Sequence, residues 1–322
     1  MLVPVLKARY AIDSNRRLAL AEKQWPVNLA GECWGDPEHS SYKYEPETAF
    51  IKPSTDVVLI GQAYAPNARA TEVNVTLRVG PVEKTVRVIG DRYWVKRCGM
   101  VWITKPEPFE RIPLTYERAF GGWDRSHPDP ERHSFESRNP VGTGFRYKKG
   151  TFEEGIRLPN LEDPQHPIKN TRSKVPPAGF GFTSPNWQPR AAYAGTYDEK
   201  WMKERMPLLP KDFDRRFFNA ASSGLISPQY LKGNEPVSIE NASPNGRLSF
   251  NLPGVPSPEC RVQLRGGSDR HLQSHLDTVI INTDDNVLFL IWRTNLVLRS
   301  GPQDLVSIEV RTQDSPVLHA VA

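Results

Sequence analysis

The chain has 322 residues, of which 42 are basic and 37 acidic, so its formal net charge is +5. Because the two signs are interleaved along the chain and form no basic block, the sequence argues against nucleic acid as a partner. The three cysteines are widely separated and show no CxxC pair or short metal-ligand spacing, which favours reduced thiols in a cytoplasmic protein.

Neither a signal peptide nor a membrane span is predicted. Lys7, Arg9 and Asp13 interrupt the N-terminal stretch, where a signal peptide needs an unbroken apolar run. No segment approaches the roughly 18 to 20 consecutive apolar residues that a spanning helix requires. Proline is frequent, with 30 residues, so we expect few long helices and many ordered loops.

The first part of the chain predicts antiparallel strands. In the stretch 72–80, the apolar residues Val73, Val75, Leu77 and Val79 alternate with polar ones, which is typical of a strand with one buried and one wet face. The link VGPVEK that follows predicts a hairpin. The strands expected in this part cover 56–65, 72–80, 83–95 and 113–120.

The last part of the chain repeats this pattern. Asp284, Asp285 and Asn286 predict a tight turn between two apolar strands. We expect Trp292 and Val279, which lie on these strands, to point inward. The strands expected in this part cover 247–254, 260–266, 277–298 and 305–313.

Between these strands, the residues from 121 to 236 show little periodicity and are rich in Pro, Gly, Arg and aromatic side chains. The expected fold class is therefore mainly β, with antiparallel, sandwich-like sheets and an irregular middle segment that contains one or two short helices. We expect one β-rich unit over 1–322. An alternative division has two lobes, with an N-terminal sandwich-like part, the middle segment and C-terminal strands over 1–120, 121–236 and 237–322.

One short helix is predicted after residue 196. Thr196 and Glu199 fit the S/T-x-x-E capping box, and Pro207 ends the helix. A second short turn follows, with Asp212 as its expected cap. Aromatic residues four apart share one face in each element, and we expect them to belong to the core.

The sequence carries no catalytic motif of the common kinds: there is no GxSxG, GxxxxGK[ST] or HExxH, and no GxGxxG after a strand. His127, Asp129 and His133 could bind a metal, but the prolines among them predict a surface loop. His271 and His275 have the spacing that suits zinc on a helix, but no third ligand is near, so a surface or capping role is favoured. We therefore expect no enzymatic activity, no metal and no cofactor.

Six motifs in the middle of the chain resemble a bacterial family known as domain of unknown function family 2169. They are ERAFGG (117–122), RNPVGTGF (138–145), LPNLEDP (158–164), PAGFGF (177–182), PRAAYAGTYDEKW (189–201) and LLPKDFDRRFFNAA (208–221). The resemblance extends over about residues 15–300. After NAA this chain continues with SSGLISPQYLKGNEPV, which departs from the family pattern and bears on partner contacts in that loop.

The family resemblance implies a function as well as a fold. Members are similar to proteins encoded beside VgrG spike, PAAR-tip and toxin genes of type VI secretion clusters. It implies a cytoplasmic adaptor or chaperone that binds an effector, often one containing a PAAR domain, and helps to load it onto the VgrG spike. No nucleic acid is expected as a partner.

Arginine and aromatic side chains of the middle segment are the candidate partner-binding residues, because these types are enriched at interface hot spots. The alternative is that many of them are buried packing or arginine–carboxylate pairs. The candidates are Arg118, Trp123, Arg125, Arg138, Phe145, Trp187, Arg190, Tyr193, Tyr197, Trp201 and Arg205.

Two further functions fit the sequence. The eight tryptophans also suit a carbohydrate-binding or carbohydrate-cleaving β-sandwich, since aromatic rings stack on sugar faces. The same surfaces would suit a structural subunit of a larger assembly. An exposed tryptophan row with opposed carboxylates would favour the former, and a large self-interface would favour the latter.

Overall fold

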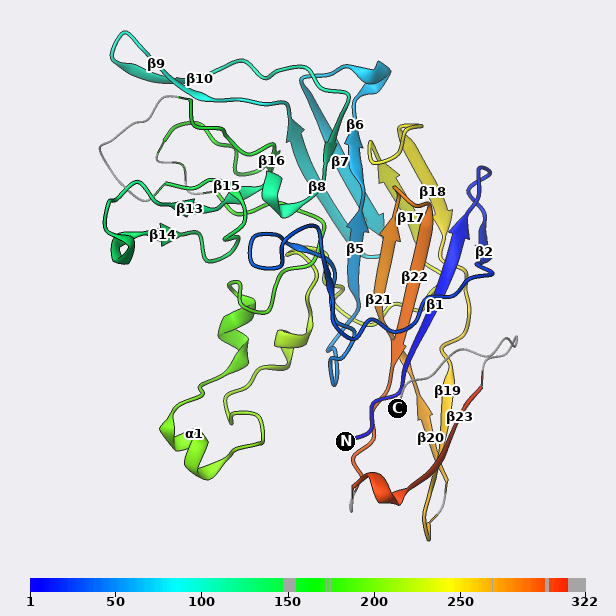
Figure 1. Ribbon diagram of the computed structural model, residues 1–322. Coiled ribbons are helices and arrows are strands. Elements are labelled where there is room, and N and C mark those ends of the chain that lie inside the picture. The colour runs from blue at the N-terminus through cyan, green and yellow to red at the C-terminus, as the bar shows by residue number, and fades with distance from the viewer. Residues whose placement is uncertain (147–154, 172, 174, 268, 299–300, 312–322) are drawn as a thin grey trace.

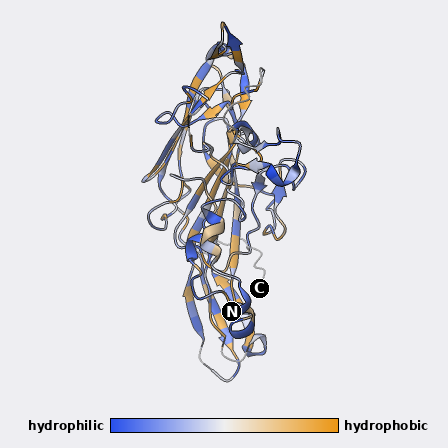
Figure 2. Ribbon diagram, turned by 90° about the vertical axis from the view of Figure 1, so that its left-hand side faces the viewer, coloured by the Kyte–Doolittle hydropathy of each residue, from blue (hydrophilic) through white to orange (hydrophobic). Residues whose placement is uncertain are grey.

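The computed structural model describes residues 1–146, 155–171, 173, 175–267, 269–298 and 301–311. The fold is mainly β, as the sequence predicts, and most of its sheets are antiparallel (Figure 1). Seen from the left-hand side of Figure 1, the molecule is elongated, and hydrophobic and hydrophilic residues are interspersed along its strands (Figure 2).

The central sheet has five strands from both ends of the chain. Its order is β2-β1-β22-β21-β5. The bounds are Leu18–Leu20 for β2, Val5–Ile12 for β1, Val287–Arg293 for β22, His275–Asn282 for β21 and Asp56–Ile60 for β5. All neighbours are antiparallel except β5 and β21, which are parallel. This parallel pair was not expected, because its two strands are far apart in the sequence.

A second five-stranded sheet has the order β16-β8-β7-β17-β18. Its bounds are Leu161–Glu162 for β16, Val82–Ile89 for β8, Glu72–Val79 for β7, Pro236–Glu240 for β17 and Arg247–Asn251 for β18. The β7–β8 hairpin is the one that the sequence predicts, and its turn contains Gly80 at a φ of 53°. Glycine adopts this left-handed conformation without the steric cost that a side chain imposes.

The remaining strands form small sheets. Three strands have the order β20-β19-β23, with bounds Arg270–Gln273, Glu259–Leu264 and Leu305–Arg311. The two-stranded sheets are β3–β4 (Glu32–Cys33, Tyr42–Tyr44), β6–β11 (Gln62–Tyr64, Arg111–Pro113), β9–β10 (Trp94–Arg97, Met100–Ile103), β12–β15 (Phe120–Gly121, Thr143–Gly144) and β13–β14 (Trp123–Asp124, Ser134–Phe135).

One continuous hydrophobic cluster contains residues of both five-stranded sheets. Trp292 and Val279 from the central sheet are fully buried in it, which confirms the predicted inward orientation. Leu77 of β7 and Ile239 of β17 belong to the same cluster. Burial of apolar area is the main favourable contribution to folding, so this shared core holds the two sheets together.

The predicted helix is α1 (Glu199–Glu204), but its cap differs from the prediction. Asp198 is the N-cap, and its side chain accepts a hydrogen bond from the backbone N–H of Trp201. Thr196 instead donates its hydroxyl to the Asp212 carboxylate, at 2.7 Å. That bond draws together the two ends of the segment that carries α1.

The second predicted turn is the 3₁₀ helix η5 (Arg215–Phe218). Asp214 caps it by accepting from the Arg216 backbone N–H, so the expected cap Asp212 is wrong. The Asp212 carboxylate instead accepts hydrogen bonds from the backbone N–H and the hydroxyl of Thr196. The other 3₁₀ helices are η1 (Pro66–Ala68), η2 (Tyr116–Arg118), η3 (Pro130–Arg132), η4 (Arg190–Ala194) and η6 (Pro302–Asp304).

Among the residues that the structure describes, no helix has the length and apolar character that crossing a membrane requires.

Candidate functional site

A network of buried charges joins the central sheet to the middle segment. Charged side chains are seldom buried unless they are paired, so a connected group of them marks a built feature of the fold. Its members are Lys7, Glu45, Glu47, Lys52, Asp56, Arg190, Asp277 and Arg293, all of them buried. Four are basic and four are acidic, so their formal charges balance.

Asp56 on β5 is the best-satisfied member of this ionic network. One of its carboxylate oxygens accepts from Lys52 Nζ at 2.7 Å and from the Ala220 backbone N–H at 2.8 Å. The other oxygen accepts from Asn219 Nδ2 at 2.9 Å. The parallel pairing of β5 with β21 places Thr278 opposite Asp56, and Thr278 Oγ1 lies 3.0 Å from the same Lys52 ammonium. Burial alone would lower the pKa of Lys52, but the carboxylates of Asp56 and Glu45 raise it above its ordinary value.

Arg190 ties the middle segment to this network. Its guanidinium forms an ion pair with the buried Glu45 carboxylate. It also donates from Nε to the Phe217 carbonyl and from Nη1 to the Thr183 carbonyl, both at 2.7 Å. Burial raises the pKa of Glu45, while Arg190 and then Lys52 oppose that rise. Arg190 therefore holds together segments that are distant in the sequence.

A second branch of the network reaches β1 and β22. Lys7 on β1 pairs with Glu47 at 2.6 Å. Arg293, at the end of β22, donates from Nη2 to the Glu47 carbonyl at 3.0 Å, and its Nη1 lies 3.1 Å from Asp277 Oδ2. Asp277 in turn accepts from the Thr278 hydroxyl at 2.8 Å, which connects this branch to Lys52.

A pocket of about 270 Å³ opens beside this second branch. Tyr230 and His275 stack face to face in its wall, with ring centroids 4.4 Å apart and planes 7° from parallel. The Tyr230 hydroxyl donates to the Lys52 carbonyl. The pocket is lined by Ile51, Lys52, Tyr230, His275, Asp277, Arg293, Thr294 and Asn295.

Two of the predicted partner-binding residues are buried in the fold. Trp187 is 3% exposed and packs edge-on against Tyr116, with ring centroids 5.3 Å apart. Arg190 is buried in the ionic network. Neither side chain is open to a partner in this fold, so both support the architecture instead.

Two other predicted arginines are half-buried and already hold carboxylate or amide groups. Arg118 donates to Asn160 Oδ1 at 3.2 Å. Arg138 forms a two-pronged hydrogen bond with Glu136, at 2.7 and 2.8 Å, and also donates to the Val175 carbonyl. The Arg138–Glu136 contact is an arginine–carboxylate pair of the kind that the alternative interpretation expects, whereas Arg118 bonds to an amide oxygen.

Two predicted residues lie at the surface of the β13–β14 hairpin. The Trp123 ring is exposed and stacks on Phe135, with centroids 4.5 Å apart. The Arg125 guanidinium lies over the Trp123 ring at 5.2 Å. The last aromatic candidate of this region, Phe145, is half-buried against Phe120.

The remaining predicted residues are Tyr193, Tyr197, Trp201 and Arg205. They lie on or just before the segment that carries α1, residues 195–212, which we call the arm. Tyr197 packs against Trp201 with ring centroids 4.7 Å apart, while Tyr193, just before the arm, lies under the Arg216 guanidinium. Trp201 Nε1 donates to the Leu208 carbonyl and Arg205 Nε to the Leu209 carbonyl, both at 2.9 Å, on the segment that follows the helix. The expectation that these aromatics belong to the core is wrong for Tyr197, which is exposed, and for Trp201, which is half-buried and outside the hydrophobic cluster.

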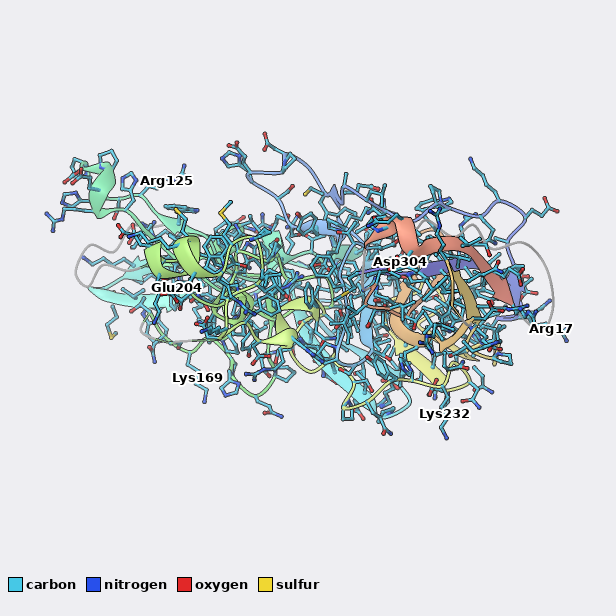
Figure 3. The ribbon with its side chains drawn as sticks, turned by 90° about the horizontal axis from the view of Figure 1, so that it is seen from below. Arg17, Arg125, Lys169, Glu204, Lys232 and Asp304 are labelled. Atoms are coloured by element: carbon cyan, nitrogen blue, oxygen red, sulfur yellow. The ribbon has the colours of Figure 1, made fainter. Side chains whose placement is uncertain are left out.

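The arm and two hairpins project from the same side of the molecule (Figure 1). Seen from below, Arg125 and Glu204 lie toward one end of the molecule, with Arg17, Lys232 and Asp304 toward the other (Figure 3). We call the three projections, β9–β10, β13–β14 and the arm, the projecting face. Ten of the eighteen exposed large hydrophobic side chains in the described part of the chain lie on it: Met100, Val101, Trp102, Trp123, Phe135, Tyr197, Met202, Met206, Leu208 and Leu209.

Sequence reasoning missed these exposed aliphatic side chains and a lysine–serine pair. Lys84 Nζ lies 2.5 Å from Ser222 Oγ and donates to the Ser223 carbonyl at 2.6 Å. Burial lowers the pKa of Lys84 to about 7. A neutral lysine beside a serine hydroxyl could activate it as a nucleophile. Ser222, however, is only 1% exposed, so its hydroxyl is not open to a substrate.

The histidines considered as metal ligands have other contacts. His127 accepts from the Asp129 backbone N–H, and His133 bonds to the His127 carbonyl. His271 lies on β20, where it pairs with Glu259, and His275 begins β21, so the two are not on a helix. No group of three His, Cys, Asp or Glu side chains is arranged to hold a metal ion within the described residues.

Comparison with known proteins identifies the family. The family model described as "Uncharacterized protein conserved in bacteria (DUF2169)" matches residues 1–293. Because the match covers most of the chain, the protein belongs to this family, and the resemblance drawn from the six motifs is confirmed. Searches of curated proteins and of solved structures found no match.

Proposed function

We propose that this protein is a cytoplasmic adaptor that binds a type VI secretion effector, one carrying a PAAR domain, and helps to load it onto the VgrG spike. The observation that carries a binding function is the concentration of exposed hydrophobic side chains on the projecting face. The resemblance of the motifs supplies the class of client.

The chemistry of the projecting face suits a protein partner. Exposed apolar side chains that gather on one side of a molecule mark a candidate interaction site. Met202 and Met206 are unbranched and adapt to irregular partner surfaces, while Trp123 with Arg125 above it is an anchor of the type found at hot spots. Desolvating these side chains against a client would supply the binding free energy.

The arm holds its apolar side chains in a fixed shape. A helix of six residues is unstable alone in water, so α1 depends on contacts around it. The Thr196–Asp212 bond closes the base of the arm, and Trp201 Nε1 donates to the Leu208 carbonyl near its tip. A preorganised arm loses less conformational entropy on binding, which favours affinity.

We also propose that the protein binds its client without chemical transformation. The lysine–serine pair is closed to substrate, and the buried ionic network is satisfied mainly by itself and by backbone groups. These features support a rigid scaffold.

The experiment is co-purification of the tagged adaptor with the effector encoded beside it and with the VgrG protein. The test variant is Leu208→Asp, on the arm. Its matched control is Leu29→Asp, since the two leucines are 60% and 61% exposed and only Leu208 lies on the projecting face. Burying an aspartate in the proposed interface should weaken binding by about 2 kcal/mol, or about 30-fold.

Wild-type and Leu29→Asp proteins should retain the effector, and Leu208→Asp should lose it at an unchanged melting temperature. The proposal fails if the wild-type protein captures neither the effector nor VgrG, and if deletion of its gene leaves effector delivery intact. Saturable binding of a polysaccharide instead would favour the carbohydrate-binding alternative.

A further inference from the structure

The pocket beside Arg293 is unlike a gap between loops, because three of its lining side chains are buried charges. Lys52, Asp277 and Arg293 are each at most 5% exposed. Burying a charge costs free energy unless the fold or a ligand compensates it. None of these residues belongs to the projecting face, so a ligand site at this pocket is independent of the adaptor function.

The described residues satisfy only part of the hydrogen-bonding capacity of the Arg293 guanidinium. Its Nη2 donates to the Glu47 carbonyl, but its Nε has no hydrogen-bond partner there. The contact of Nη1 with Asp277 Oδ2, at 3.1 Å, is an ion pair without hydrogen-bond geometry. A guanidinium has five N–H donors, so Arg293 retains donor capacity beside a pocket large enough for a small molecule.

The unfilled donors that line the pocket favour an anion. Lys52 and Arg293 contribute two positive charges to the lining and Asp277 one negative charge, but Lys52 is paired with Asp56 and Glu45, so Arg293 is the cation whose hydrogen-bond donors the described residues leave unfilled. Asp56, which neutralises Lys52, is not part of the lining, and its oxygens are occupied by Lys52, Asn219 and the Ala220 N–H.

Two further features select among anions. Asp277 in the lining repels a dianion such as phosphate more strongly than a monoanion. Ile51 and the Tyr230 ring supply apolar wall, which an inorganic ion would leave unused. The 270 Å³ volume suits an organic group about the size of one amino acid, and it is near the lower limit for small-molecule sites.

We propose that this pocket binds a carboxylate, with Arg293 as the group that receives its charge and the Tyr230 ring as the wall for its carbon skeleton. The carboxylate comes either from a free small organic acid or from the C-terminus of a polypeptide. Both sources present the same planar monoanion, and a planar carboxylate matches the geometry of guanidinium donors.

The first measurement uses the unmodified full-length protein, so it does not depend on a variant folding. The side-chain Nε–H signal of Arg293 is followed by NMR while acetate, propionate or benzoate is added at constant ionic strength. Acetamide and inorganic phosphate are the comparison probes. We expect a saturable shift with the monocarboxylates and binding about tenfold weaker or more with acetamide, as the loss of a charge-assisted hydrogen bond implies.

The second measurement blocks the pocket. Asn295 lines it and is only half-buried, so Asn295→Trp should fill the space without disturbing the core, and Asn295→Ala is its matched control. We expect Asn295→Trp to weaken carboxylate binding about tenfold or more and Asn295→Ala to bind as the wild type does.

A pair of tripeptides, one with a free C-terminus and one amidated, distinguishes the two sources. Tighter binding of the free peptide than of acetate supports a polypeptide terminus, and tighter binding of a small acid supports a free metabolite. The proposal is overturned if no carboxylate gives a saturable shift and the pocket holds water only. It is also overturned if acetamide or phosphate binds as tightly, if the amidated peptide binds as well as the free one, or if Asn295→Trp has no effect.

Discussion

Replacing Arg190 tests whether the ionic network holds the middle segment to the central sheet. In Arg190→Met, the Glu45 carboxylate loses its ion pair and the carbonyls of Phe217 and Thr183 lose their donors. Removing one partner of a buried ion pair costs about 3–5 kcal/mol, because the remaining charge is left uncompensated. We expect the melting temperature to fall by on the order of 5–10 °C.

A double-mutant cycle isolates the cause. Glu45→Gln combined with Arg190→Met removes the buried charge as well as its partner, so it should recover more than half of the lost stability. The control is Arg216→Met, which breaks an exposed pair with Asp214 in the same segment. An exposed pair contributes only about 0–1 kcal/mol, so this control should be nearly neutral.

The pH dependence adds a signature of its own. Burial already raises the pKa of Glu45, and losing Arg190 raises it further. In the folded variant, Glu45 therefore keeps its proton at pH values above about 4.3, the ordinary pKa at which the unfolded chain releases it. The free energy of unfolding of the variant must therefore fall as pH rises from about 4.3 toward the raised pKa of the folded state. Urea unfolding at pH 5.5 and pH 8 should show the larger loss at pH 8. The reasoning is refuted if Arg190→Met loses less than about 1 kcal/mol, or if the double variant is no more stable than the single one.

Three other predictions concern separate parts of the chain. Trp187→Ala should destabilise by about 3–5 kcal/mol in chemical unfolding, since it empties a buried site, and a surface role for Trp187 would leave stability unchanged. Thr196→Val should loosen the base of the arm, raising the rate of limited tryptic cleavage within the arm about fivefold at an unchanged melting temperature; equal cleavage rates would show that this bond does not hold the arm. Burial lowers the pKa of Lys84 to about 7, so above pH 7 this lysine is neutral in the folded protein but stays charged in the unfolded chain up to about pH 10. The free energy of unfolding should therefore rise with pH above 7, by at most about 1.4 kcal/mol per pH unit. Lys84→Met should lack this rise in melting scans from pH 6 to 9, and identical profiles would contradict the assignment.

Local sequence patterns predicted those parts of the fold that are made by neighbours in the chain. The β7–β8 hairpin follows from alternating apolar residues, and the β21–β22 hairpin follows from two apolar runs around a tight turn. Helix α1 follows from a capping signal that lay two residues from the true cap. The parallel pairing of β5 with β21 could not be predicted in this way, because strand periodicity carries no information about a distant partner.

The ionic network was missed for a related physical reason. A charged residue in a loop, such as Glu45 or Lys52, is solvated in most proteins, so nothing in its local sequence indicates burial. Only the fold brings Glu45 to Arg190 and Lys52 to Asp56. In the arm, by contrast, residues expected to be buried lie at the surface. The spacing of Tyr197 and Trp201 correctly predicts that they share a face, but the two rings pack against each other instead of against the core.

The pairing of β1 with β22 also has a consequence for how the protein is made. Residues 5–12 leave the ribosome long before their strand partner, residues 287–293. At about 5–20 residues per second, the first strand waits on the order of 15–60 s with an unpaired edge. The central sheet therefore closes only after residues 287–293 have emerged, so the nascent chain passes through a long period in which it is exposed to aggregation and would gain from general chaperones. The proposed adaptor would therefore itself depend on chaperones while it is synthesised.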